Sequence, residues 1–192
     1  MSALQSVLVI GAGPVGNDAT QVMARMPEPP TIVVADRNLD RAAATAASVA
    51  DRTAARVEQL DASDPDAVAR LAAGVDVVLH LAHSGCNETV MAGALAAGAH
   101  YVDVAMSPAE AEAFMTGTAH THDAAFRSAG HAAVSGIGTS PGMTNLLAVM
   151  LAEPLIQIDS VDLWTAWSFG SDDDPATRLR RYRPLYSAAL EL

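Results

Sequence analysis

Short apolar runs alternate with segments of helical spacing along most of this chain. Residues 7–10 are four apolar residues in a row, which suits a strand buried on both faces, as parallel strands are. After Gly16, apolar residues recur at helical spacing as far as Met26, and a second apolar run follows at 31–35. The pattern therefore predicts a strand, a glycine turn, a helix and a second strand.

The same alternation continues and predicts the fold class. Further strands are expected over residues 56–61, 75–82, 101–105 and 131–137, and further helices over 39–50, 65–73, 88–97, 109–129 and 143–151. Strands that alternate with helices are typical of parallel sheets. We therefore predict an α/β fold, a Rossmann doubly wound parallel sheet, over residues 1–152.

The character of the sequence changes after Pro154. Residues 156–169 alternate between two faces, with Val161, Leu163, Trp167 and Phe169 on the apolar one, as in a strand of an antiparallel sheet. Residues 153–192 are too few to bury a sheet of their own. We expect them to begin an incomplete second domain of the α+β class or to form a tail, and we expect a homo-oligomer to cover the apolar face.

The turn between the first strand and helix carries three glycines with separate functions. Gly11 permits a tight turn, Gly13 lets the backbone approach a pyrophosphate, and Gly16 lets the helix pack closely on the sheet. Asp36 stands twenty residues after Gly16 at a strand end, where a carboxylate can bind both ribose hydroxyls of an adenosine. This combination predicts a dinucleotide site. The alternatives are a glycine-rich turn in another α/β protein and a site for a different nucleoside, such as a methyl donor.

Two neighbouring residues bear on which dinucleotide binds. Asp36 would repel a 2′-phosphate and so favours NAD, whereas Arg37 beside it can offer that phosphate a charge-assisted hydrogen bond. We predict NAD or NADP as the cofactor, with NAD preferred.

Composition excludes several classes of function. Twenty-two acidic and eleven basic residues give a net charge of −11, which opposes binding to nucleic acid or to anionic membranes. The chain contains no lysine, which excludes P-loop and Schiff-base lysine chemistry. A single cysteine, no signal-peptide pattern and no apolar run long enough to span a membrane lead us to expect a cytoplasmic protein.

Few side chains outside the glycine turn are candidates for chemistry. His83 follows the strand at 75–82 and could contact the nicotinamide carboxamide or carry a proton, while Cys86 is expected to be a small buried hydrophobe. Tyr101 and Asp103 end the next strand and could reach a substrate pocket, although packing is the simpler role for Tyr101. We expect no metal site, and the catalytic residues stay unassigned.

Four segments together resemble the saccharopine dehydrogenase family, reductases with a nucleotide domain followed by a substrate and dimerisation domain. The segments are residues 7–16, 35–37, 81–103 and 140–148, and the likeness extends from about residue 6 to 168. The sequence departs from the family pattern at Ser140, where an acid is common, and at His83, where a proline is common.

The resemblance implies a set of cofactor contacts. The pyrophosphate would lie against Gly11, Ala12, Gly13, Pro14, Val15 and Gly16. The adenosine would lie against Asp36 and Arg37, with its adenine edge on Asp61 and Ala62, and the nicotinamide against Leu81, Ala82, His83 and Ser84.

The resemblance also implies an activity. It predicts an NAD(P)-dependent oxidoreductase that transfers hydride to or from a small amino acid or keto acid, with the cofactor supplying the chemistry. The alternative is a non-catalytic dinucleotide-binding module that senses redox state or regulates a partner, because the bulk of the substrate domain is missing from the sequence.

Overall fold

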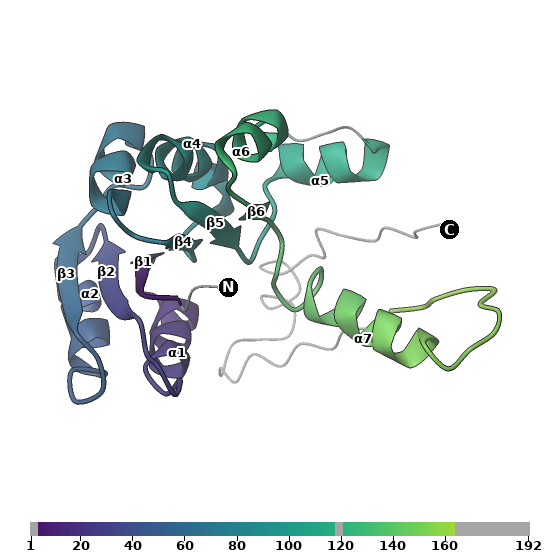
Figure 1. The fold of residues 1–192 in the computed structure, drawn as a ribbon, viewed down its shortest axis with the longest axis horizontal. Helices are drawn as coiled ribbons and strands as arrows, with labels where there is room; N and C mark the ends of the chain where they lie inside the picture. Colours follow the sequence, from purple (N-terminus) through teal and green to yellow (C-terminus); the bar gives the residue numbers. More distant parts are fainter. Residues whose placement is uncertain (1–3, 118–120, 164–192) are drawn as a thin grey trace, which may run out of the picture. The chain divides into compact units, whose positions relative to one another are not determined.

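A computed structural model describes residues 4–117 and 121–163 of the chain. The chain divides into two units, Met1–Gly142 and Met143–Leu192. The first unit contains a parallel sheet with helices on both faces (Figure 1). The domain boundary predicted after residue 152 remains a prediction.

The sheet has six strands in the order β3-β2-β1-β4-β5-β6, all parallel. The strands are β1 (Ser6–Ile10), β2 (Thr31–Asp36), β3 (Ala55–Gln59), β4 (Val77–His80), β5 (His100–Asp103) and β6 (Ala133–Val134). The helices of this unit are α1 (Pro14–Met23), α2 (Leu39–Ala47), α3 (Pro65–Ala72), α4 (Asn87–Ala97), α5 (Pro108–Thr116) and α6 (Asp123–Ala129). This order confirms the predicted Rossmann-like α/β fold.

Alternate residues of β1 and β2 point to opposite faces of the sheet, and each face is buried under a different pair of helices. Leu8 and Ile10 pack in one cluster with α3 and α4, whereas Val7 and Val9 pack in another with α2 and the end of α1. All four are at most 1% exposed, as the continuous apolar run predicts. The two helical layers lie on opposite sides of the sheet in Figure 1.

Polar residues begin several helices, and glycines end others. Asn38 caps α2 by accepting a hydrogen bond from the Arg41 N–H at 3.1 Å, and Asp64 caps α3 through the Ala67 N–H at 3.0 Å. Gly98 ends α4 and Gly130 ends α6, both with left-handed backbone angles.

Two elements differ from the sequence-based expectation. The single helix expected over 109–129 is divided, because Gly117 has a φ of +66° and α6 begins only at Asp123. Of the strand expected over 131–137, only Ala133–Val134 forms, because Gly136 has a φ of +73° and donates its N–H to the Asp103 side chain and not to the ladder.

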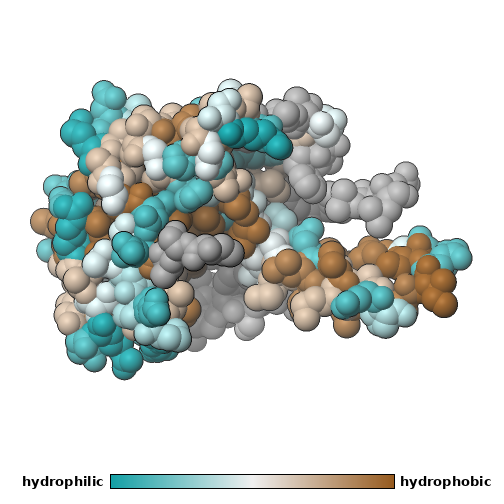
Figure 2. Space-filling view, viewed as in Figure 1, coloured by the Kyte–Doolittle hydropathy of each residue, from teal (hydrophilic) through white to brown (hydrophobic). Residues whose placement is uncertain are grey.

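The described part of the second unit is the helix α7 (Met143–Ala152) and the residues after it, as far as 163. None of the α7 residues is buried, and Figure 2 shows its apolar side chains in brown. Residues 156–163 do not form the strand that the alternating pattern predicts, and the rest of that segment, with Trp167 and Phe169, lies outside the described residues. Within residues 4–117 and 121–163, no helix is long and apolar enough to cross a bilayer.

Candidate functional site

A cavity of about 370 Å³ opens at the carboxyl edge of the sheet, where β1 and β4 lie side by side. From β1 the chain adds β2 and β3 on one side of β1, and it then returns to place β4 on the other side. The strand order therefore reverses between β1 and β4. Ligands of open α/β sheets bind at such switch points. The cavity is lined by Ile10, Gly11, Gly13, Asp36, Arg37, Arg41, Leu60, Asp61, Ala62, Leu81, Ala82, His83 and Cys86.

The three glycines of the turn differ in what surrounds them. Gly11 has a φ of +102° and donates its N–H to the Ala35 carbonyl at 2.8 Å, so it makes the tight turn out of β1. A Cβ at Gly16 would overlap the carbonyl oxygen of Gly11, so this glycine permits the close packing of α1. A Cβ at Gly13 would meet no atom within 4 Å. Gly13 is therefore open toward the cavity that it lines.

Asp36 connects the end of β2 to the glycine turn. Its Oδ2 accepts a hydrogen bond from the Ala12 N–H at 2.8 Å, and its Oδ1 accepts one from the Asn38 N–H at 2.8 Å. Each carboxylate oxygen has a second lone pair that can accept a further hydrogen bond. Asp36 can therefore hold the turn and still bind a ribose hydroxyl.

Two guanidinium groups lie at the same end of the cavity as Asp36. Arg37 follows it directly, and Arg41 stands in the first turn of α2. Both are exposed, and Arg41 also lines a neighbouring cavity of about 430 Å³ together with Gly13, Pro14 and Asn17. This end of the site therefore places two positive charges beside the carboxylate of Asp36, in a chain whose net charge is −11.

Asp61 and Ala62 form the wall of the cavity that follows β3. The Asp61 carboxylate accepts hydrogen bonds from the hydroxyl of Ser63 at 2.7 Å and from its N–H at 2.9 Å. These two bonds lower the pKa of Asp61, and Arg37 lowers it further. Asp61 is therefore ionised at neutral pH, next to the apolar side chain of Leu60.

The far end of the cavity is formed by the loop after β4. Leu81 donates its N–H to the Ile10 carbonyl at 2.7 Å, which fixes the start of the loop to β1. Nδ1 of His83 accepts a hydrogen bond from the Gly85 N–H at 3.0 Å. A neutral ring therefore carries its hydrogen on Nε2, where it can donate to a ligand.

The structure brings most of the predicted contact residues around this cavity. Ala12 and Pro14 line the neighbouring cavity instead, and Val15, Gly16 and Ser84 line neither. The prediction missed four lining residues: Ile10, Arg41, Leu60 and Cys86. Of these, Arg41 had a signal in the sequence, because it is a second arginine four positions after Arg37. The contacts of these residues with a cofactor stay a prediction.

Tyr101 and Asp103 do not reach either cavity. They are 0% and 1% exposed, and the Tyr101 hydroxyl donates to Oδ2 of Asp103 at 2.9 Å. Burial, and then the nearby Asp103, raise the pKa of Tyr101, so its hydroxyl stays a donor. Tyr101 therefore packs in the core, which is the simpler role expected for it.

The fold and the glycine turn define a Rossmann-like nucleotide-binding domain. A family described as the saccharopine dehydrogenase NADP binding domain matches residues 7–134, which is more than half of the chain. The chain therefore belongs to this family. The family name specifies NADP, so the preference for NAD predicted from Asp36 has no support from it.

The saccharopine dehydrogenase of yeast agrees with this fold. The apo form of saccharopine dehydrogenase (L-Glu forming) from Saccharomyces cerevisiae is 26% identical with a TM-score of 0.65 over 79% of this chain. The match covers 31% of the yeast enzyme, so the chain spans under a third of that protein's length. Triphenylmethane reductase from Citrobacter sp. with NADP(H) matches 66% of this chain and 48% of its own at 20% identity and a TM-score of 0.45. A hydroxysteroid dehydrogenase from Escherichia coli matches 68% of this chain and 73% of its own at 12% identity and a TM-score of 0.49.

Proposed function

We propose that the chain binds a nicotinamide dinucleotide along the carboxyl edge of its sheet. It would act as the nucleotide domain of an oxidoreductase, in hydride transfer to or from a small amino acid or keto acid. The observation that carries the proposal is Gly13, which stands open beside the cavity where a Cβ would occupy the space a pyrophosphate needs.

The first helix offers the pyrophosphate a favourable electrostatic setting. Helix α1 begins at Pro14 and has no acidic residue in its first turn, so nothing within that turn neutralises the positive end of its dipole. Its first N–H groups have no partner within the helix and are free for an anion. The turn can therefore bind phosphate despite the acidic composition of the chain.

The charges around Asp36 bear on the choice between NAD(H) and NADP(H). Asp36 disfavours a 2′-phosphate, but each of its oxygens already accepts a backbone N–H, and two guanidinium groups, of Arg37 and Arg41, lie at this end of the cavity. Arginine binds phosphate through charge-assisted hydrogen bonds. We propose that the balance favours NADP(H), in agreement with the name of the family.

The other residues of the site have roles in orientation. A bound dinucleotide would supply the hydride, and the protein would hold it in one geometry. His83 would donate from Nε2 to the carboxamide, and Ala82 and Cys86 would exclude water from that end of the cavity. The side chains that grip a substrate are expected in a second domain, and the substrate is proposed as an amino acid or keto acid from the family relationship alone.

Calorimetric titration of the 192-residue chain with NADPH and with NADH tests the proposal. Binding of NADPH that is lost in Gly13→Ala supports it, and a folded preparation that binds neither dinucleotide contradicts it. Oxidation of NADPH with a panel of amino acid and keto acid pairs tests the second half of the proposal. Binding without turnover by this chain and by any longer natural form would favour a regulatory module.

A further inference from the structure

The loop that ends the cavity is compact, and its position depends on the elements to which its two ends are attached. Its residues Leu81 to Cys86 include a short helix, Ser84–Cys86, and the Cys86 N–H bonds the His83 carbonyl at 3.0 Å. The first end is fixed to β1 by Leu81, as described above. The second end continues directly into Asn87, the first residue of α4.

Asn87 is 1% exposed, and among the described residues its side-chain amide acts only as a hydrogen-bond donor. Its Nδ2 lies 2.7 Å from Oε2 of Glu110, 2.8 Å from the Ala105 carbonyl and 3.2 Å from Oδ2 of Asp103. Its Oδ1 has no hydrogen-bond partner among the described residues. One amide group thus connects the start of α4 to β5, to the loop after β5 and to α5.

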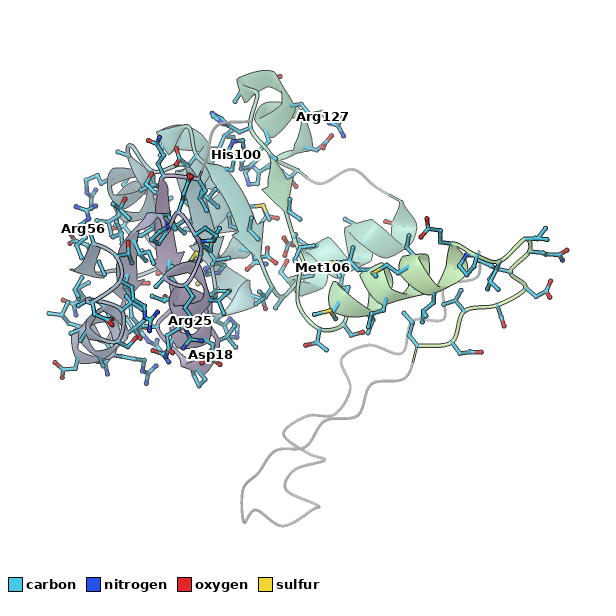
Figure 3. All side chains as sticks on the ribbon, turned by 60° about the horizontal axis from the view of Figure 1, so that its bottom comes forward. Asp18, Arg25, Arg56, His100, Met106 and Arg127 are labelled. Atoms are coloured by element: carbon cyan, nitrogen blue, oxygen red, sulfur yellow. The ribbon has the colours of Figure 1, made fainter. Side chains whose placement is uncertain are left out.

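The two carboxylates that receive this amide are themselves held by other elements. Asp103 also accepts the Tyr101 hydroxyl at 2.9 Å and the Gly136 N–H at 2.8 Å. The Ser135 hydroxyl lies 2.9 Å from Asp103 and 3.0 Å from Glu110, so it can donate to either. This Asp103–Glu110 network lies at the carboxyl end of β5; His100, labelled in Figure 3, begins the strand.

Glu110 also begins α5 in a capping box with Ser107. Its Oε2 accepts the Ser107 N–H at 2.5 Å, and its own N–H bonds the Ser107 hydroxyl at 3.3 Å. Burial raises the pKa of Glu110, but the hydrogen bonds from Ser107, Asn87 and Ser135 outweigh it and lower the pKa overall. Glu110 is therefore an ionised group, and it requires the donors that surround it.

A polar network of this kind fixes geometry more than it adds stability. Burying two carboxylates costs free energy, and well-packed apolar side chains are often as stable in such a place. A network in which each carboxylate receives several donors instead restricts the arrangement of the segments that it joins. Here those segments are the start of α4, which directly follows the loop at the cavity, the end of β5, the first turn of α5 and the residues after β6.

We propose that Asn87 is a positioning residue for the nicotinamide half of the cofactor. It contacts no cavity itself; it fixes Cys86 and His83, which line the end of the cavity, against the Asp103–Glu110 network. The inference rests on the proposed function. It predicts that the network governs the nicotinamide end of the site and leaves the adenosine end unchanged.

Calorimetric affinities for two ligands test this inference. NADPH occupies the whole site, and 2′-phospho-ADP-ribose lacks only the nicotinamide ring. In Asn87→Ala we expect the affinity for the fragment to stay within about twofold and that for NADPH to fall about tenfold, the equivalent of one hydrogen bond. The fluorescence of bound NADPH, which reports the surroundings of the reduced ring, should move toward that of free NADPH.

A second variant keeps the test decisive if Asn87→Ala does not fold. Ser135→Ala removes one donor from the network at a residue far from Asn87 in the sequence, and it should shift the same affinity ratio in the same direction by less. Ser128→Ala is the matched control, because its hydroxyl bonds only the Ala124 carbonyl of its own helix.

Each remaining outcome decides against the inference. Equal losses for both ligands would show a merely structural role for Asn87, and an unchanged ratio in both network variants would show no link to the cavity. Wild-type protein that binds neither ligand would overturn the proposed function and this inference with it. If the wild type binds both ligands and the variants have the same ratio of the two affinities as the wild type, the inference alone is overturned.

Discussion

Asp36 and Ala12 are joined by a hydrogen bond of 2.8 Å from the backbone N–H of Ala12 to the carboxylate, across twenty-four positions of sequence. The residue that the fingerprint assigns to the ribose thus also holds the turn assigned to the pyrophosphate. A change at Asp36 therefore acts on both halves of the adenosine diphosphate site. Its effect on binding cannot be interpreted without its effect on stability.

Asp36→Ala should destabilise the domain. It leaves the N–H of Ala12, which is 3% exposed, without its acceptor, and an unsatisfied buried donor costs about 1–3 kcal/mol. Asp36→Asn keeps one acceptor oxygen and should cost less. Denaturant unfolding measures both. Equal stability of Asp36→Ala and the wild type would contradict this function of the hydrogen bond.

Gly13→Ala and Gly16→Ala should have opposite effects. Gly13 has a φ of −71° and open space around it, so alanine fits and should leave stability unchanged or raise it by about 0.4–1 kcal/mol, while dinucleotide binding is lost. Alanine at Gly16 would collide with the backbone of Gly11, and overpacking of this kind costs about 1–3 kcal/mol or more. Melting curves with and without NADPH separate the two; full NADPH affinity in Gly13→Ala would argue against a pyrophosphate at this turn.

Arg41→Ala should weaken NADPH binding about tenfold and leave NADH binding nearly unchanged, because it removes a charge-assisted bond to the 2′-phosphate. Arg52→Ala is the control, since Arg52 is exposed, pairs with Asp51 at 3.8 Å and lines neither cavity. Competition titrations measure the ratio of the two affinities. A wild-type preference for NADH would restore the original argument from Asp36.

The free energy of unfolding should fall as the pH drops below about 6.5, in part because of His80. Burial lowers the pKa of His80 below its ordinary value of 6.5, although the His83 carbonyl opposes the shift. The unfolded chain therefore binds a proton that the folded chain does not, and stability decreases with falling pH by at most about 1.4 kcal/mol per pH unit for one group. His80→Gln should flatten this slope between pH 6.5 and 5. Parallel slopes for variant and wild type would show that His80 does not contribute.

The chain should self-associate through α7, where Leu147 is 48% and Met150 67% exposed. Apolar side chains on a helix surface favour contact with another copy. Sedimentation at several concentrations measures this. Met150→Glu should weaken the association, whereas Asn145→Glu, a control of equal charge, should not. A wild-type monomer at every concentration would contradict the expectation.

The sheet could be predicted from the sequence because β1, β2 and β4 are largely apolar runs and because the glycine turn has a narrow set of structural contexts. The same applies to Gly98, which ends α4 in a left-handed conformation, because a glycine directly after a helical pattern is a local signal for a helix end. These features depend on residues that are close together in the sequence, so a local sequence pattern is enough to predict them.

Features that depend on distant partners were missed. β6 ends early because the Gly136 N–H bonds the Asp103 carboxylate, 33 positions away. Tyr101 and Asp103 were considered for a pocket because they end a strand at the correct edge. No periodic pattern in the sequence indicates the role of Asn87, because its three acceptors, Asp103, Ala105 and Glu110, come from three different segments.

The pairing of β1 with strands on both sides has a consequence for the nascent chain. β1 pairs with β2 soon after synthesis, but its other edge pairs with β4, and the Ser6 N–H bonds the Asp76 carboxylate seventy positions later. A ribosome adds about 5–20 residues per second, so this edge stays open for about 4–14 s. An apolar strand with an unpaired edge is a site for wrong pairing between chains. Folding during translation is therefore most exposed to aggregation in this interval, and a chaperone that covers β1 would be needed only until residue 80 has left the ribosome.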